Sequence, residues 1–396
     1  MHVQFTPLDN GVVELSLETP AKFNAGLWVG AKRPDGFHAV DSVMVPLPAL
    51  ADSLVIRIGT PKAITASLIQ PPPPEGLGDC PLRWQAFTSG ITDGIDDCGP
   101  LAIAHTGFIP EIAPEQEVSH NLMARAATLF CQALNVSVPG LWIGCHKRIP
   151  MQAGLGGGSS NAAGVLLALK HWALATEAIS PVSLAEHLPP LSERLMTLSA
   201  HLGSDVPFFM QTPAIRPAVV SGRGEQIAPI ASAQTTPPFV QAVVIKPHKV
   251  AMSTAVAYQT LAELRQGAVT IIARNIVTKQ SQTESSVIHS GDCHVACEYA
   301  PRNDARCLIS QCLIDGNPLT SLPSGILHND FDSVFAQQFP RYAGYYQQLT
   351  DLGASHVLLC GSGAAFIGLF DAALTSAQQA QVLETFVPAQ FWLTWV

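Results

Sequence analysis

A glycine-rich segment carries the clearest chemical signal in the sequence. Four glycines, at positions 154, 156, 157 and 158, fall within five positions between an expected strand and an expected helix. Backbone without Cβ atoms can approach a ligand closely and turn its N–H groups inward, and a helix N-terminus adds partial positive charge. The pattern predicts a phosphate-binding loop, whose residues are Pro150, Met151, Gln152, Ala153, Gly154, Leu155, Gly156, Gly157, Gly158, Ser159 and Ser160.

Other interpretations of this loop fit less well. A flexible glycine linker would not be followed at once by a helix rich in Ala and Leu, as this segment is. The loop lacks the Gly-Lys-Ser/Thr ending of a P-loop, and its spacing does not match the dinucleotide fingerprint, which places an acidic residue about 20 positions further on. A third kind of nucleotide loop is therefore expected.

Two charged residues stand out because charge is scarce. Charged residues make up 13% of the chain, against about 25% in an average protein. Lys22 lies near Asn24 in an otherwise uncharged strand, where a buried ammonium group could hold a hydroxyl or a phosphoryl group. The alternative is a surface lysine whose head reaches water. Asp205 precedes an apolar segment that would shield a carboxylate, or else it caps a short helix.

Composition and charge exclude several classes of protein. The net charge is -9 and no basic stripe is visible, so nucleic acid is not an expected partner. No apolar run reaches the about 18 residues that a membrane span needs, so no membrane association is expected. Nine cysteines and an N-terminus without a basic stretch followed by an apolar one indicate the reducing cytoplasm.

The elements that would position these residues alternate between strand and helix. An alternating pattern predicts a strand over 12–17, apolar runs predict strands over 25–29 and 43–47, and a further strand is expected over 53–58. Helical spacing predicts a helix over 121–134 with Ser119 as its cap, and a second one after Gly158 with Ser159, Ser160 and Asn161 as available caps. A short strand over 141–145 lies between them.

The second half of the chain reads as a separate unit. A strand is expected over 239–245 and a helix over 254–264, and strand and helix alternate again from Val334 to Phe370. Two stretches, about 61–115 and 267–323, are poorly patterned and are expected to be insertions. The sequence predicts an α+β protein of two domains, 1–230 and 231–396.

The glycine loop resembles the phosphate loop of the GHMP kinases, and further blocks sharpen this resemblance. In order along the chain they are Pro20-Ala21-Lys22-Phe23-Asn24, Arg33-Pro34-Asp35-Gly36-Phe37-His38, the loop itself, Leu202-Gly203-Ser204-Asp205-Val206-Pro207-Phe208-Phe209, Gly222-Arg223-Gly224-Glu225, Asn329-Asp330-Phe331 and Gly361-Ser362-Gly363. The second block is typical of the branch that phosphorylates 4-diphosphocytidyl-2-C-methyl-D-erythritol. The resemblance implies an ATP-dependent kinase of the non-mevalonate (MEP) isoprenoid pathway.

The resemblance also implies roles for individual residues. Asp205 becomes the general base that takes the proton of the substrate's 2-hydroxyl, and Lys22 its electrostatic partner, while Mg2+ bridges the phosphates of ATP. The glycine loop binds ATP together with Asn121, Leu122 and Lys147. The cytidyl substrate is implied to contact Asn24, Phe37, His38, Thr254 and Tyr258. From the sequence alone, a single Phe or Tyr is more often a plain core residue.

For the fold, the resemblance implies an N-terminal domain like domain 2 of ribosomal protein S5 and a ferredoxin-like C-terminal domain. The two insertions make this chain longer than the usual members. Cys360 stands where a small hydroxyl residue commonly precedes the last glycine motif. No metal ligand is assigned, although a loop serine is a candidate for Mg2+.

Three alternatives stay open on the sequence. The chain could be another small-molecule kinase of this family, acting for instance on mevalonate or homoserine, although Phe37 and His38 argue against it. It could be a catalytically silent nucleotide-binding module, but Lys22 and Asp205 are both present. A zinc site is the third alternative; its ligands would come from Cys293, Cys297, Cys307 and Cys312, with His289 and His294 nearby.

Overall fold

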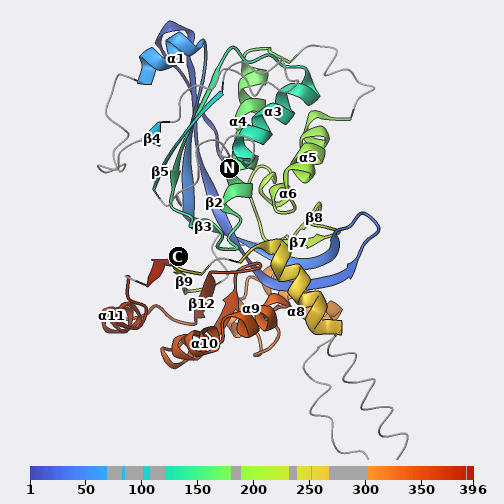
Figure 1. The fold of residues 1–396 in the computed structure, drawn as a ribbon, viewed down its shortest axis with the longest axis vertical. Coiled ribbons are helices and arrows are strands. Elements are labelled where there is room, and N and C mark those ends of the chain that lie inside the picture. The colour runs from blue at the N-terminus through green and yellow to red at the C-terminus, as the bar shows by residue number, and fades with distance from the viewer. Residues whose placement is uncertain are drawn as a thin grey trace, which may run out of the picture.

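Two β-sheets with their helices form the molecule (Figure 1). The computed structural model describes residues 1–68, 83–84, 101–107, 121–179, 189–231, 239–250, 252–266, 302–388 and 390–396. The first sheet has the order β1-β2-β3-β6-β5-β4; in addition β10 pairs with β2, β7 pairs with β3, and β8 pairs with β7. Its strands are β1 (Gln4–Pro7), β2 (Val13–Lys32), β3 (His38–Ile58), β4 (Arg83–Trp84), β5 (Leu101–Gly107), β6 (Leu141–Lys147), β7 (Ala218–Ser221), β8 (Gln226–Pro229) and β10 (His328–Asn329).

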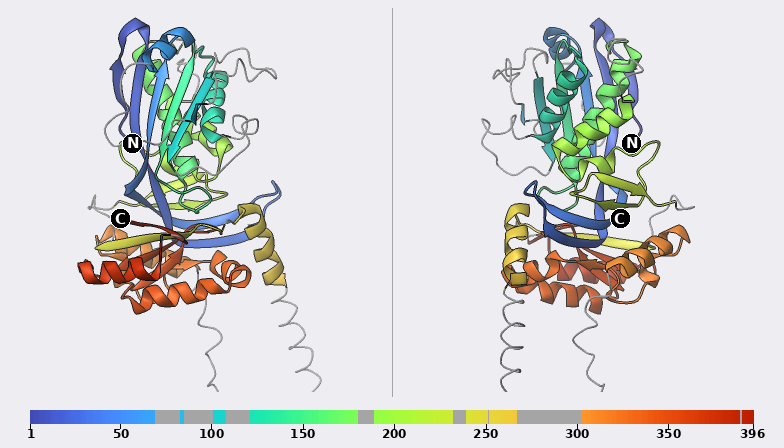
Figure 2. Two further views of the ribbon diagram at one scale, coloured as in Figure 1. Left: turned by 60° about the vertical axis from the view of Figure 1, so that its left-hand side comes forward. Right: turned by 90° about the vertical axis from the view of Figure 1, so that its right-hand side faces the viewer.

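The long antiparallel pair β2 and β3 runs from the first sheet into the second half of the molecule (Figure 2). Expected strands 12–17 and 25–29 are thus parts of one strand, as are 43–47 and 53–58, so the prediction of four short strands was wrong. The pairing register shifts at Pro20/Ala21, Asn24/Gly26 and Val29/Lys32. Such bulges accommodate Pro20 and Gly26, whose presence makes a continuous strand hard to recognise in the sequence.

Helices α3 (Leu122–Leu134), α4 (Gly157–Ala175) and α5 (Leu191–Leu202) pack together beside the first sheet (Figure 1). Asn121 caps α3, its Oδ1 accepting from the Met123 N–H at 2.9 Å, and the expected cap Ser119 lies outside the described residues. Helix α4 begins earlier than expected, at Gly157 with Gly156 as N-cap. The prediction of Ser159, Ser160 and Asn161 as caps was therefore wrong, since all three lie within the helix.

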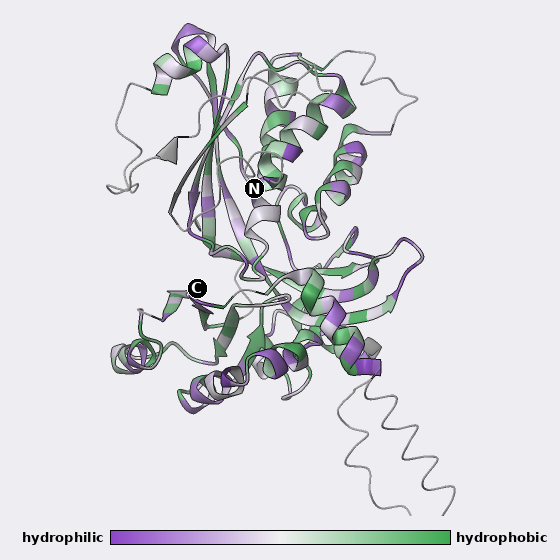
Figure 3. Cartoon of the chain, viewed as in Figure 1, coloured by the Kyte–Doolittle hydropathy of each residue, from purple (hydrophilic) through white to green (hydrophobic). Residues whose placement is uncertain are grey.

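The second sheet is antiparallel with the order β11-β12-β9-β13. Its strands are β9 (Gln241–Pro247), β11 (His356–Leu359), β12 (Phe366–Phe370) and β13 (Phe391–Trp395). Alternate residues of β9 face opposite ways: Val243 and Ile245 pack with the helices, whereas Ala242 and Val244 pack with β2 and β3. Both faces are therefore buried, which agrees with the apolar colouring of these strands in Figure 3.

Helices pack against the second sheet, and one helix packs against β2 and β3. Helix 254–266, which the sequence predicted over 254–264, contributes to the same core as α9, α10 and α11. Helix α8 instead packs on the side of β2 and β3 through Ala305, Ile309 and Leu313. The bounds of the remaining helices are α1 (Pro61–Leu68), α6 (Val206–Phe209), α8 (Arg302–Ile314), α9 (Phe331–Gln338), α10 (Arg341–Asp351) and α11 (Ser376–Thr385), with single 3-10 turns at Asp9–Gly11 and Leu319–Ser321.

The two expected insertions contain more regular structure than the sequence indicated. Within 61–115, α1 buries Ile64 and β5 pairs in parallel with β6. Within 267–323, α8 forms part of the core. The expectation of irregular structure was wrong for these elements. Of both stretches the structure describes only residues 61–68, 83–84, 101–107 and 302–323. Strand β10, from beyond residue 230, pairs with β2, so the chain crosses the predicted domain division.

A partly buried carboxyl on α9 makes stability depend on pH. Burial raises the pKa of Asp332 to about 6, although the Tyr346 hydroxyl donates to its Oδ1 at 2.8 Å. Because the folded pKa lies above the ordinary value of 3.8, the wild type loses stability as pH rises from about 4 to 6. Asp332→Asn should raise the free energy of unfolding at pH 8 by about 1–3 kcal/mol.

Urea denaturation of both proteins at pH 8 and pH 4.5 measures this effect. The advantage of Asp332→Asn should shrink strongly at pH 4.5, where the native carboxyl is already protonated, and asparagine keeps an oxygen for Tyr346. An equal advantage at both pH values would contradict the assignment.

Candidate active site

The glycine loop is wedged between β2 and the segment that follows β11. The Lys22 N–H donates to the Leu155 carbonyl at 3.0 Å, and the N–H groups of Ala364 and Ala365 donate to the carbonyls of Gln152 and Ala153, both at 3.2 Å. A loop bound from two sides is not a flexible linker, so that alternative was wrong.

Two glycines of the loop adopt left-handed backbone in tight surroundings. At Gly154, with φ +74°, a Cβ atom would lie 1.7 Å from the Cys360 carbonyl oxygen. At Gly156, with φ +72°, it would lie 3.0 Å from Phe209 Cζ and 3.1 Å from Lys22 Cγ. Glycine is therefore required at both positions, and the second brings the loop against the Lys22 side chain.

Lys22 is buried and paired, so the surface-lysine alternative was wrong. The residue is 2% exposed, and its Nζ lies 2.9 Å from Asn24 Oδ1 and 3.3 Å from Asp205 Oδ2. Asn24 is itself oriented by Ser42, whose Oγ accepts from Asn24 Nδ2 at 2.8 Å and donates to the Gly26 carbonyl at 2.6 Å. The ammonium group is thus held by Asn24 of β2, which Ser42 of β3 orients, and it faces the Asp205 carboxylate.

Asp205 occupies the N-cap position of α6, but its side chain makes no capping hydrogen bond. The alternative prediction, that Asp205 caps a short helix, is correct for its position at the start of α6, but its side chain does not cap the helix. Val206, Phe208 and Phe209 are fully buried and anchor the turn. The Asp205 side chain is 30% exposed, so its carboxylate is held by Lys22 on one side and accessible on the other. This arrangement suits a base that must accept a proton from a bound hydroxyl.

A buried carboxylate that the sequence analysis did not single out holds the residues that directly precede the glycine loop. Asp52, fully buried on β3, pairs with Lys147 Nζ and accepts at 2.8 Å from the N–H groups of both Arg148 and Ile149. Lys147 Nζ also lies 3.3 Å from the Cβ position of Gly157, at the start of α4. A lone aspartate in an apolar strand was the available signal. An ATP contact by Lys147 stays a prediction.

The other residues predicted to contact ATP lie beside the loop or near it. Leu122 Cδ1 lies 3.7 Å from the Cβ position of Gly158, and Asn121 is the cap that precedes Leu122. Ser160 is fully buried, and within the described part of the chain its Oγ has no hydrogen-bond partner. An unpaired buried hydroxyl at the N-terminus of α4 is available to a ligand.

Of the predicted substrate residues, Asn24 contacts Lys22, and the others make contacts of their own. Phe37 is 51% exposed, with the Arg223 guanidinium 5.1 Å from its ring centroid, so it is not a core residue. The rings of His38 and Tyr258 stack at 5.1 Å with an interplanar angle of 23°. Thr254 Oγ1 lies 3.3 Å from Ser362 Oγ. Arg223 belongs to the block Gly222-Arg223-Gly224-Glu225, for which the sequence suggested no role; in the structure it contacts the Phe37 ring.

Tyr258 also belongs to the core, because it packs edge-on against Phe331 with ring centroids 5.0 Å apart. Burial, together with the negative charge of Asp205, raises the pKa of Tyr258 to about 12. The phenol therefore stays neutral, and Tyr258 lies close enough to Asp205 to be affected by its charge.

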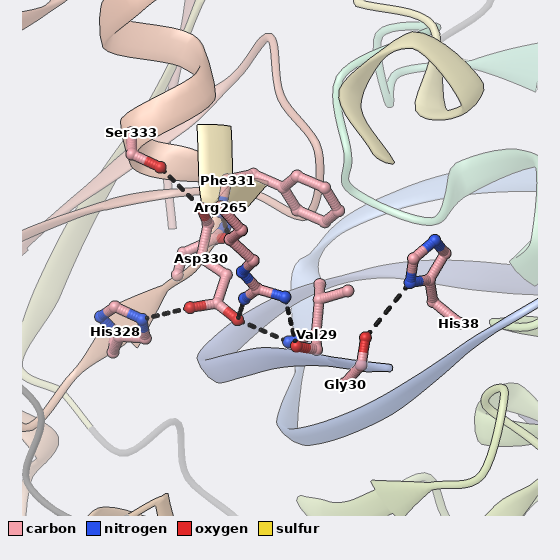
Figure 4. A network of polar contacts seen from close by, with 9 residues as sticks. Val29, Gly30, His38, Arg265, His328, Asp330, Phe331 and Ser333 are labelled. Carbon is pink, nitrogen blue, oxygen red and sulfur yellow. Dashed lines mark hydrogen bonds and ion pairs between the residues drawn. The ribbon is translucent and has the colours of Figure 1, made fainter. Parts of the chain in front are cut away.

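The block Asn329-Asp330-Phe331 joins the two halves of the molecule. Asn329 Nδ2 donates to the carbonyls of Leu359 and Gly361 at 2.9 and 2.7 Å. Figure 4 shows Asp330 at the centre of a second set of contacts with Val29, Arg265 and His328. Burial alone would raise the pKa of Asp330, but hydrogen bonds from His328 and Val29 and the charge of Arg265 lower it below its ordinary value.

Only part of the cysteine cluster can be located. His289, Cys293, His294 and Cys297 lie outside the described residues. On α8, Cys307 is exposed and Cys312 is buried, with the Cys312 Sγ donating to the carbonyls of Asn317 and Pro318 at 3.5 Å. In the part that is described, no three His, Cys, Asp or Glu side chains come together as a metal site.

Comparison with known proteins places this site in a family. A model described as the GHMP kinases N terminal domain matches residues 121–212. The 4-diphosphocytidyl-2-C-methyl-D-erythritol kinase of Solibacter usitatus is 30% identical over 354 residues, which cover 89% of this chain and 80% of that protein. The chain belongs to this kinase family. The same kinase from Solidesulfovibrio magneticus is 29% identical, with 91% of this chain and 89% of that protein covered.

Solved structures of the family and its neighbours agree with the fold. A crystal structure of 4-(cytidine 5'-diphospho)-2C-methyl-D-erythritol kinase matches with a TM-score of 0.53 at 26% identity, covering 96% of this chain and 98% of that one. The mevalonate kinase of L. major, at 12% identity and a TM-score of 0.52, shares the fold. The expected two-domain α+β GHMP kinase fold is therefore confirmed. No described helix is both long and apolar enough to cross a membrane.

Proposed function

We propose that the protein transfers the γ-phosphoryl group of ATP to the 2-hydroxyl of 4-diphosphocytidyl-2-C-methyl-D-erythritol, giving the 2-phosphate and ADP. The observation that carries this proposal is the buried Lys22 Nζ 3.3 Å from Asp205 Oδ2, directly beside Gly156 of the glycine loop. The names of the relatives supply the substrate. A cytoplasmic location is part of the proposal.

The residues present account for each requirement of the transfer. Loop N–H groups and the N-terminus of α4 bind the phosphates of ATP and hold the γ-phosphorus in line with the acceptor. A bond forms between the substrate's 2-oxygen and the γ-phosphorus while the bond to the β–γ bridging oxygen breaks. The hydroxyl proton passes to the Asp205 carboxylate. The Lys22 ammonium group balances negative charge on the transferred group.

The site fits a magnesium ion that enters with ATP. Mg2+ is usually held by substrate phosphates, waters and one or two protein oxygens rather than by a protein cage. The buried Ser160 Oγ, which lacks a hydrogen-bond partner within the described chain, is the protein oxygen best placed to serve it. When bound, the ion neutralises phosphate charge.

The aromatic group is proposed to hold the cytosine end of the substrate. Phe37 offers an exposed ring face, and Tyr258 and His38 form a stacked pair close to Asp205. A flat base can stack on such rings while the His38 ring recognises its polar edge. Asn24 and Thr254 are proposed to contact the remainder of the substrate.

Direct assay tests the proposal. The protein is incubated with ATP, Mg2+ and the diphosphocytidyl substrate, and 31P NMR should show a new phosphomonoester as ADP appears. Mevalonate and homoserine serve as parallel substrates. Transfer to either of these but not to the cytidyl compound would favour another small-molecule kinase of the family. ATP binding without any transfer would favour the silent nucleotide-binding module.

A further inference from the structure

A buried carboxylate fixes one peptide of β2 near the aromatic group (Figure 4). The side chain of Asp330 is 4% exposed, and its Oδ2 accepts from the Val29 N–H at 2.6 Å and from Arg265 Nη2 at 2.7 Å. Its Oδ1 faces His328 Nε2 at 2.9 Å. Arg265 Nη1 donates at 2.8 Å to the Val29 carbonyl. Both polar groups of Val29 are therefore held by the Arg265–Asp330 pair.

The pair acts at a register shift between β2 and β3. Pairing between β2 and β3 jumps from Val29↔Val40 to Lys32↔His38, so Gly30 lies inside a register shift. The carbonyl of Gly30 is the group that contacts His38 Nδ1, at 3.2 Å. Because the register shifts here, the direction of this carbonyl depends on how the two peptide groups that flank Val29 are held.

This carbonyl selects one tautomer of His38. A carbonyl oxygen only accepts hydrogen bonds, so Nδ1 carries the proton and Nε2 of the neutral ring is an acceptor. The His38 ring is also held by Tyr258, whose ring stacks on it. Tyr258 and Arg265 lie seven residues apart on helix 254–266, which is two turns, so both point from the same face of that helix.

We propose that Arg265 and Asp330 are positioning residues that hold His38 in the orientation and tautomer needed to accept a hydrogen bond from an exocyclic amino group of the base. They act on the Gly30 carbonyl through Val29, and on Tyr258 through the shared helix. The inference rests on the proposed function and deepens it. It assigns the preference for an amino-bearing base to a pair that does not itself touch the substrate.

Arg265→Gln tests the proposal, with Arg306→Gln as the matched control. Arg306 Nη1 lies 2.9 Å from both carboxylate oxygens of Asp41, so it also bridges a helix of the second half to the β2–β3 pair, without touching Val29 or Gly30. Arg265→Gln should raise KM for the cytidyl substrate about tenfold, the effect of one weakened hydrogen bond. KM for ATP should stay unchanged and kcat nearly so, and Arg306→Gln should leave all three unchanged.

Arg265→Lys adds a conservative comparison. Lysine keeps the positive charge beside Asp330 but cannot span the carboxylate and the Val29 carbonyl together, so its KM should lie between wild type and Arg265→Gln. Asp330→Asn should behave like Arg265→Gln. If that buried variant does not fold, the variants of Arg265, whose side chain is 39% exposed, still decide the question.

A spectroscopic readout separates this inference from the proposed function. With 15N-labelled histidine, long-range 1H–15N correlations should show His38 protonated at Nδ1 in the wild type, the signal being assigned by its loss in His38→Gln. Arg265→Gln should give a mixture of tautomers. An unchanged tautomer and unchanged substrate KM, or equal effects from Arg306→Gln, would overturn the inference. Absence of phosphorylated cytidyl product in the wild type would instead overturn the proposed function.

Discussion

Replacing Asp205 with asparagine is expected to lower kcat by about 10²- to 10⁴-fold, the range for loss of a general base. The substitution keeps the size of the side chain but removes the oxygen that accepts the proton. KM for ATP should change little, because Lys22 keeps its contact with Asn24 at 2.9 Å and the loop keeps its contact with β2. Steady-state kinetics with both substrates varied measures the two effects separately.

Asp371→Asn is the matched control for this experiment. Asp371 is exposed in the turn after β12, and the same change of charge there should leave kcat unaffected. Full turnover in Asp205→Asn would remove Asp205 as the base. A rise in KM for ATP with unchanged kcat would instead show that Asp205 acts in nucleotide binding.

Gly154→Ala is expected to lower kcat/KM for ATP about 100-fold, the cost of misplacing reacting groups by about 1 Å. The new Cβ would lie 1.7 Å from the Cys360 carbonyl oxygen and 2.5 Å from its carbon, and φ is +74°. Backbone on both sides leaves no flexible side chain to move away. The loop must therefore separate from the segment after β11, and its N–H groups lose their alignment.

Gly353→Ala separates this clash from backbone strain. Gly353 has φ +100° in the turn after α10, and its Cβ would meet nothing within 4 Å. This variant should lose some stability but keep its kinetic constants for ATP. Unchanged kinetics in Gly154→Ala would show that the loop does not depend on its contact with Cys360.

The sequence was sufficient to select the residues that the structure brings together at the candidate site, because each of them stands in an unusual local context. Lys22 lies in an uncharged strand, Asp205 precedes an apolar turn, and glycines cluster before a helix. The resemblance then related these distant segments to one another. The α+β fold followed from the same patterns, except where bulges joined short strands into β2 and β3.

What could not be predicted depends on partners far apart in the chain. Asp52 is paired with Lys147 across 95 positions, and Asp330 reaches Val29 across 301. No local pattern shows that a buried carboxylate will meet a particular N–H group, because register shifts and helix packing bring the two together. For the same reason Arg265 looks like an ordinary helix-surface arginine until the fold is known.

The continuity of β2 and β3 restricts how the two halves of the molecule can move. One strand carries both Lys22, beside the glycine loop, and Val29, which is held by the second half. A hinge near residue 230 would not by itself let the two halves move apart. The chain also passes between the halves along β2 and along β3, and these two strands are paired to each other. Opening must bend or shear this ladder at its bulges. We therefore expect nucleotide and substrate to enter by displacement of side chains and short loops rather than by a swing of one half against the other.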